Sequence, residues 1–177
     1  MVGAVLVQNT TWSGVKLAIA TLRRLGLLRL RPLARVSPVR LARLIRPAGC
    51  PNVKSRRLLA LLHWLEARGG IVKLGLIPTP RLRSELLAVN GIGYETADSI
   101  LLYALHRRVF VVGAYTRRVL ARYGLIQGNE NYEQLRLTIE KALPRRASLY
   151  GEFHALLVRL GKTYCRYSPS CEGCPLE

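Results

Sequence analysis

One turn, Gly91-Ile92-Gly93, constrains the fold of this chain more than any other feature of its sequence. Apolar residues recur at helical spacing before the turn, over residues 86–89, and again after it, from Tyr94 to His106. The pattern predicts two helices joined by a tight hairpin over residues 86–106. Glycine adopts positive φ without strain, and its missing side chain lets a phosphate approach the backbone N–H groups at the start of the second helix.

The pair of glycines favours a phosphate site over an ordinary helix–helix corner, because a corner would need only one glycine. We expect positive φ at both of them. Contacts of this kind fix the register on a nucleic acid but do not read its bases. The residues predicted to contact the nucleic acid here are Gly91, Ile92, Gly93, Tyr94 and Thr96.

Helical periodicity dominates the whole chain, and no convincing alternating strand pattern appears. Ser37-Pro38 and Thr79-Pro80 are typical helix starts, and Asn131 with Gln134 predicts a capping box. We therefore expect an all-α fold of two packed helical lobes with a cleft between them. The predicted parts are a first lobe over 1–108 that includes the hairpin, a second lobe over 109–164, and a cysteine loop over 165–177.

The charge of the chain points to a polyanionic partner. Lys and Arg together number 28 against 10 acidic residues, for a formal net charge of +18, and most of the cations are arginines, whose forked donors match phosphate oxygens. Nucleic acid is the simplest partner, although a membrane surface or an RNA-rich assembly would satisfy the charge as well. With no signal peptide and no apolar run that could span a membrane, we expect a cytoplasmic, nucleoid-associated monomer without a membrane partner.

Several runs of residues together resemble the HhH-GPD superfamily of helix–hairpin–helix DNA glycosylases, in its endonuclease III-related branch. They cover nearly the whole chain and are more specific as a set than singly. These runs are 7–12 (VQNTTW), 45–49 (IRPAG), 91–98 (GIGYETAD), 111–118 (VVGAYTRR), 151–154 (GEFH) and the C-terminal cysteines.

The resemblance implies a two-lobed helical protein that bends duplex DNA and extrudes a damaged or mispaired base into its cleft. Gln8 stands where the family has the residue that fills the gap in the base stack, although it is equally consistent with a polar helix start. Trp12 is a candidate wall of the base pocket, or else an aromatic residue of the core. Arg117 and Arg118 are candidate phosphate contacts.

The same resemblance places two substitutions at the reaction centre. Glu95 occupies the position of the lysine that forms a Schiff base in the bifunctional members, and a carboxylate cannot form an imine. This pattern is similar to the monofunctional, 3-methyladenine-glycosylase-like branch. Gly113 occupies the position of the family's catalytic aspartate, so it offers no carboxylate for water activation or for the cationic sugar. Asp98, the only aspartate in the chain, is expected to be structural.

The cysteines resemble part of a metal loop. Cys165, Cys171 and Cys174 match the start of the family's four-cysteine [4Fe–4S] loop, and no fourth cysteine follows. An external fourth ligand, or zinc completed by a histidine, remains an alternative. Cys50 matches no ligand position, and His154 is expected to be a core histidine rather than a catalytic one.

These features predict a DNA glycosylase of base-excision repair that hydrolyses the N-glycosidic bond without AP-lyase activity, with Gly113 placing turnover in doubt. The alternative from another class is a non-catalytic helix–hairpin–helix protein that binds bent or damaged duplex. A basic structural RNA-binding protein is a weaker third interpretation.

Overall fold

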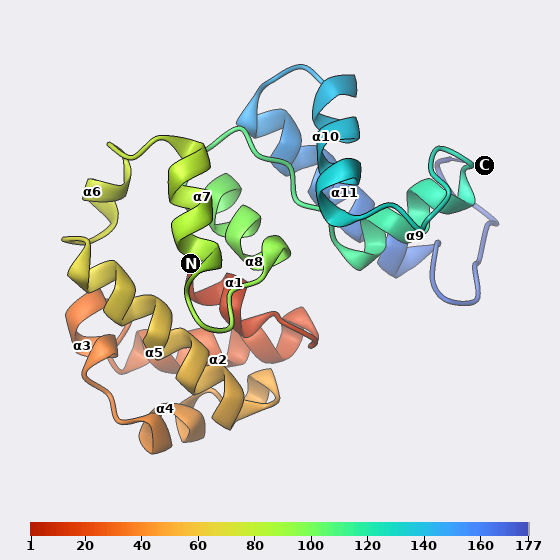
Figure 1. Ribbon diagram of the computed structural model, residues 1–177. Helices are drawn as coiled ribbons and strands as arrows, with labels where there is room; N and C mark the ends of the chain where they lie inside the picture. The colour runs from red at the N-terminus through yellow and green to blue at the C-terminus, as the bar shows by residue number, and fades with distance from the viewer. Residues whose placement is uncertain (177) are drawn as a thin grey trace. The chain divides into compact units, whose positions relative to one another are not determined.

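The computed structural model describes residues 1–176, and every regular element within them is helical, as predicted. The chain divides into two compact units, one of Met1–Ile100 and one from Leu101 onward (Figure 1). The lobe boundary after residue 108 and the separate cysteine loop remain predictions. Across the described residues, no helix has the length and apolar character needed to cross a membrane.

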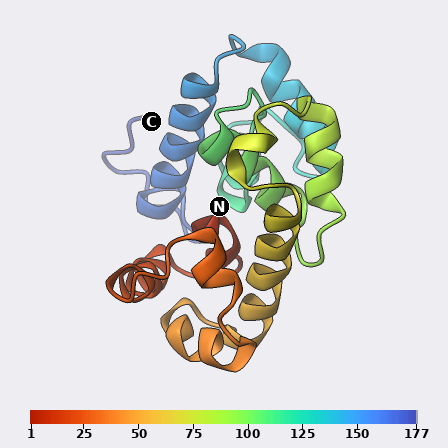
Figure 2. The same ribbon diagram turned by 90° about the vertical axis from the view of Figure 1, so that its left-hand side faces the viewer.

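The first unit is built around a long helix, α5. It packs against α1, α3 and α4 (Figures 1 and 2). Its apolar side chains Leu58 and Leu61 are buried in the core. Two further helices, α7 and α8, form the predicted hairpin. The elements of this unit are α1 Val2–Leu6, α2 Trp12–Arg24, α3 Leu30–Ala34, α4 Pro38–Leu44, η1 Arg46–Ala48, α5 Pro51–Ala67, α6 Ile71–Leu74, α7 Thr79–Leu87 and α8 Tyr94–Ser99.

A buried lysine holds three parts of this unit together. Lys54 of α5 is 2% exposed, and its Nζ donates to the carbonyl oxygens of Leu6 at 2.9 Å and Ala48 at 2.6 Å. Desolvation lowers the pKa of this amine. A lone lysine in a basic chain gives no sign of such a role, so the sequence did not identify it.

The second unit has an aromatic core. Phe110 and Tyr150 meet edge to face, with ring centroids 5.9 Å apart, and helix α9 packs along α11. Glu140 accepts a hydrogen bond from the Phe110 backbone N–H at 2.8 Å and forms an ion pair with Arg136. The π-helical turn η2 Ile100–Ala104 continues α8, and all but its first residue belong to this unit. The other elements here are α9 Ala114–Arg122, α10 Tyr132–Ala142 and α11 Ala147–Thr163.

The three helices predicted from these start signals are present, and the predicted side-chain caps are confirmed in two cases and wrong in one. Ser37 caps α4 with Pro38 in its first turn, and Asn131 and Gln134 form the complete capping box of α10. Thr79 is already the first residue of α7, and Pro78 is its N-cap, without a side-chain hydrogen bond. A proline is accepted in either of the first two helical positions, because neither N–H has a partner within the helix.

Candidate nucleic-acid interface and reaction site

The hairpin turn uses its two glycines differently. Gly91 has φ of +80°, and a Cβ built there would lie 2.2 Å from Cγ of Arg57, so the position needs glycine both for its backbone angle and for space. Gly93 is extended, with φ −91° and ψ 179°, so the expectation of positive φ at both glycines is wrong for Gly93. A Cβ on Gly93 would meet no atom within 4 Å, so the absence of a side chain leaves open space at this position.

The backbone donors of the turn are available to a ligand. Ile92 N–H closes the turn by donating to Val89 O at 3.0 Å, whereas those of Gly91 and Gly93 donate no hydrogen bond within residues 1–176. Gly93 is also the N-cap of α8, where the helix presents its partial positive charge. The turn therefore provides open N–H groups at a helix start, an arrangement that can bind an oxyanion.

A buried ion pair fixes the two arms of the hairpin. Asp98 of α8 is fully buried, and Arg83 of α7 donates to both of its carboxylate oxygens, at 2.6 Å and 2.9 Å. The guanidinium of Arg83 also lies 5.3 Å from the ring centroid of Tyr94. Asp98 is thus a structural residue of the hairpin, as predicted.

Gln8 is bound to the hairpin through both ends of its amide. Its Nε2 donates to Gly91 O at 3.0 Å and to Thr96 Oγ1 at 2.9 Å, while its Oε1 accepts from Arg57 Nη1 at 2.7 Å. The predicted insertion of Gln8 into a base stack stays a prediction, and it would require these three hydrogen bonds to break.

The other predicted contact residues differ in accessibility. Ile92 and Thr96 are 4% and 7% exposed, so they hold the shape of the loop, whereas Tyr94 is 47% exposed and accessible to a ligand. Trp12, the first residue of α2, is 45% exposed, so the alternative of a core aromatic is wrong. Its role in a base pocket remains a prediction.

Both arginines predicted as phosphate contacts make hydrogen bonds within the second unit. Arg117 donates to Glu130 O at 2.7 Å, and Arg118 donates to Cys165 O at 2.7 Å and to Gly161 O at 2.8 Å. These bonds tie α9 to the surrounding carbonyl groups. Phosphate contact by either side chain stays a prediction.

The two substituted reaction-centre positions lie at helix starts. Glu95 is in the first turn of α8, and although the residue is exposed as a whole, desolvation raises the pKa of its carboxyl group. Gly113 is the N-cap of α9, buried and extended, with φ −99° and ψ 175°, and it leaves that helix without a side-chain cap. One turn further on, the Thr116 hydroxyl is buried without a hydrogen-bond partner.

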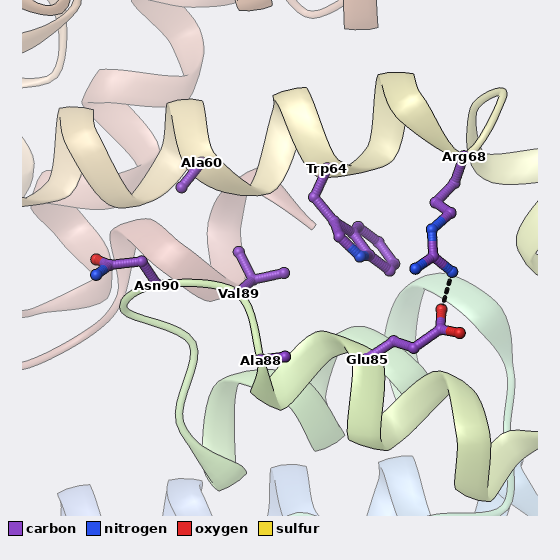
Figure 3. Close-up of a pocket in the computed structure, with 7 residues that line it drawn as sticks. All are labelled: Ala60, Trp64, Arg68, Glu85, Ala88, Val89 and Asn90. Atoms are coloured by element: carbon purple, nitrogen blue, oxygen red, sulfur yellow. Dashed lines mark hydrogen bonds and ion pairs between the residues drawn. The ribbon is translucent and has the colours of Figure 1, made fainter.

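A groove beside the hairpin was not predicted. It encloses about 310 Å³ between α5 and α7, and Figure 3 shows Trp64 on one wall and the Arg68–Glu85 ion pair spanning it. Asn90, at the tip of the hairpin, lies at its other end. Trp64 follows the helical apolar pattern of α5, so sequence reasoning had no means to separate it from the core.

The cysteines do not come together as a complete set of metal ligands in the part of the chain that the structure describes. Cys165 is buried and accepts a hydrogen bond from Arg122 Nη1 at 3.2 Å, and desolvation together with the thiols of Cys174 and Cys171 raises the pKa of Tyr123. In residues 1–176 no three His, Cys, Asp or Glu side chains come together as metal ligands. Because an iron–sulfur cluster is normally held by four thiolates, this arrangement does not fit one, and the predicted cluster is not confirmed.

His154 is half-buried and packs against the aromatic core of the second unit. Its Nδ1 lies 2.6 Å from the hydroxyl of Tyr103, and its ring meets Phe110 edge to face. Desolvation lowers the pKa of His154 to about 4, so the ring is neutral at neutral pH. This supports the structural role predicted for it.

Comparison with known proteins gives consistent results. The sequence profile of the HhH-GPD superfamily, described as base excision DNA repair proteins, matches residues 2–145. A Methanocaldococcus jannaschii protein described as a "putative DNA repair glycosylase" is 42% identical over 180 residues, covering all of this chain and 82% of that protein.

Solved structures agree in fold. The H. pylori 3-methyladenine DNA glycosylase MagIII, bound to 1,N6-ethenoadenine, superposes with a TM-score of 0.80 at 30% identity, over 91% of this chain and 82% of that one. An endonuclease III–DNA complex gives a TM-score of 0.80 at 23% identity, over 99% of this chain and 78% of that one, which is a likeness of fold.

Proposed function

The chain belongs to the HhH-GPD superfamily of base excision DNA repair proteins, and from that premise we propose that it is a monofunctional DNA glycosylase whose hydrolytic step is impaired by Gly113. The family resemblance drawn from the sequence is thereby confirmed, and with it the assignment to base-excision repair. The chain acts on duplex DNA as a monomer, and the hairpin binds a phosphate of the DNA backbone.

The absence of lyase activity follows from the chemistry of Glu95. A lyase needs an amine that attacks C1′ of the deoxyribose and forms an imine. Glu95 stands at the family's lysine position in the first turn of α8, and its carboxyl group cannot do this. Any base release therefore occurs by hydrolysis and leaves the DNA backbone intact.

A modified purine is the substrate class that the relatives favour. The MagIII structure holds 1,N6-ethenoadenine, and MagIII is a 3-methyladenine glycosylase at 30% identity. We extend that class to this chain because Glu95 cannot act as the imine-forming amine of a lyase. The Tyr94 ring, exposed at the hairpin, is available to the DNA in either case.

Gly113 is the observation that carries the proposed impairment. At the N-cap of α9 it supplies neither a base for the attacking water nor a negative charge for the cationic sugar. Removing one preorganised electrostatic group typically costs about 10²–10³ in rate. DNA binding depends on the hairpin in the first unit, so binding persists where turnover is lost.

Single-turnover base release tests this proposal. Duplexes that carry 3-methyladenine, 1,N6-ethenoadenine, uracil or thymine opposite guanine are incubated with the chain and with Gly113→Asp. We expect Gly113→Asp to release the modified purine at least about 10² faster than the chain as it stands, without strand scission. If neither protein releases any base, the enzymatic proposal fails.

Gly113 also favours a second candidate function, a non-catalytic protein that recognises damaged or bent duplex. This function predicts salt-sensitive DNA binding: the slope of log K against log salt concentration should be about −0.9 for each phosphate neutralised. It also predicts that neither protein releases a base. The same assay, run with a binding measurement, separates the two functions.

A further inference from the structure

The start of helix α9 in the second unit has four polar hydrogens without a partner. The backbone N–H groups of Ala114, Tyr115 and Thr116 are the first three of the helix and donate no hydrogen bond within residues 1–176. The Thr116 hydroxyl is fully buried and also has no partner. A buried polar atom without a partner costs free energy, so a ligand that accepts these hydrogens would be bound favourably.

The geometry of a helix directs all four donors to the same place. The N–H groups of a first turn point out of the N-terminal end, and each Cα–Cβ bond of a helix tilts toward that end. Thr116 is the third residue of α9, so its Cα–Cβ bond tilts toward the N-cap position, which Gly113 occupies, and its buried hydroxyl lies on that side of the residue. Donors that converge at the positive end of a helix dipole select an anion.

No acidic side chain of the helix satisfies this end. The first turn of α9 contains no acidic residue, whereas those of α8 and α10 contain Glu95 and Glu133. Gly113 has no side chain, so it makes no cap hydrogen bond. The nearby cations Arg117 and Arg118 donate to backbone carbonyl groups, so the donors for an anion are the neutral ones of the first turn.

We propose that the N-terminus of α9 is a binding site for a small monocarboxylate anion, of which formate is the simplest. An N-cap aspartate places its carboxylate where it accepts from the N–H groups of the second and third helical residues. A bound formate supplies the same two oxygens at Gly113, and one of them accepts from the Thr116 hydroxyl. Because Thr116 and Gly113 are both buried, a planar three-atom anion suits the site better than a tetrahedral dianion.

This site has a consequence for the reaction, which rests on the proposed function. The bound formate lies at the position of the family's catalytic carboxylate. It accepts a proton from water as the water oxygen bonds to C1′ of the deoxyribose. The N-glycosidic bond breaks, its electron pair leaves with the base, and the base takes up a proton from solvent. Millimolar formate therefore restores base release to the chain as it stands.

Binding is measured first, on the full chain without DNA. Sodium formate is titrated against sodium chloride at matched ionic strength, by thermal melting and by line broadening of 13C-formate in NMR spectra. We expect saturable binding with a dissociation constant on the order of 10 mM. Gly113→Asp should abolish it by filling the site, and Thr116→Val should weaken it about tenfold, the worth of one hydrogen bond. Thr138→Val, which alters an exposed threonine of α10, is the matched control and should leave it unchanged.

Three results would overturn the proposal: no saturable binding of formate, equal binding by Gly113→Asp, or tighter binding of inorganic phosphate than of formate. Base release is then measured separately, with and without formate. If Gly113→Asp releases a base but formate does not bind, the anion site is wrong and the glycosylase proposal stands. If formate binds but neither formate nor Gly113→Asp gives base release, the anion site stands and the proposed enzymatic function fails.

Discussion

Arg83 and Asp98 form a two-pronged ion pair inside the hairpin, with Nε to Oδ1 at 2.6 Å and Nη2 to Oδ2 at 2.9 Å. It joins α7 to α8 on either side of the glycine turn. The only aspartate of the chain therefore holds the hairpin in shape. The pair includes neither Glu95 nor Gly113, the two positions expected at the reaction centre. The ion pair therefore serves the structure of the hairpin and not the chemistry of base release.

Removing Arg83 should destabilise the protein strongly. In Arg83→Ala the Asp98 carboxylate stays buried without its main partner, which typically costs about 3–5 kcal/mol. Urea unfolding followed by circular dichroism measures the change. Arg81→Ala is the control on the same helix, because the Arg81–Glu85 pair is exposed on its arginine side and should contribute less than about 1 kcal/mol. Equal effects of the two substitutions would contradict the role assigned to the buried pair.

Alanine substitutions at the two hairpin glycines should affect different properties, protein stability at Gly91 and DNA affinity at Gly93. Gly91→Ala forces a side chain into positive φ and against Arg57, so it should lower the free energy of unfolding by at least about 1–2 kcal/mol. Gly93→Ala meets an ordinary backbone angle and open space, so stability should hardly change. The added methyl group would instead stand where we propose that a phosphate of the DNA binds.

Duplex binding and thermal melting measured on both variants check this contrast. We expect Gly93→Ala to weaken duplex affinity while its melting temperature stays near that of the parent chain. A loss of stability in Gly93→Ala as large as in Gly91→Ala would show that both glycines serve the backbone alone.

The sequence predicted the helical fold, the hairpin and two of three helix caps because these depend on local signals. Proline, glycine and capping side chains act on their immediate neighbours, and Asn131 with Gln134 forms its box within a single turn. The family resemblance added the roles expected at positions such as Glu95 and Gly113, which periodicity alone does not identify.

Contacts between distant residues were not predictable in the same way. Arg83 and Asp98 meet across the hairpin, and Gln8 reaches Gly91 from the other end of the first unit. Thr79 is a similar case. Its residue type is typical of an N-cap, but the backbone begins the helix one residue earlier than a Thr79 cap would require. The partnerless Thr116 hydroxyl depends on what surrounds α9, which a sequence pattern does not contain.

Lys54 should be essential for stability although it lies away from the hairpin turn. Lys54→Met keeps the aliphatic length but leaves the carbonyl groups of Leu6 and Ala48 without their donor, at a cost of about 2–4 kcal/mol. Lys73→Met, on the exposed surface of α6, is the control and should change the free energy of unfolding by less than about 0.5 kcal/mol. Chemical denaturation of both variants at pH 7.5 gives the comparison, and a mild effect at Lys54 would mean that water replaces the ammonium group.

His154 should make the protein less stable in mild acid. The pKa of His154 is about 4 in the folded protein, below its ordinary value of 6.5, because desolvation disfavours the charged ring. Between these values the unfolded chain binds a proton that the folded chain does not. The free energy of unfolding therefore falls as the pH drops from 6.5 toward 4, by up to about 3 kcal/mol, and is independent of this group above pH 6.5.

Denaturation of the parent chain and of His154→Gln at pH 7.5, 6 and 5 isolates this contribution, since carboxyl groups such as Glu95 titrate alike in both. The difference in stability between the two proteins should shrink as the pH falls. His106→Asn is the matched control, because His106 is exposed and its φ of +51° suits asparagine, so this variant should keep the pH dependence of the parent. If the stability of His154→Gln depends on pH as strongly as that of the parent chain, another group causes the effect, and the Tyr103–His154 contact does not contribute to it.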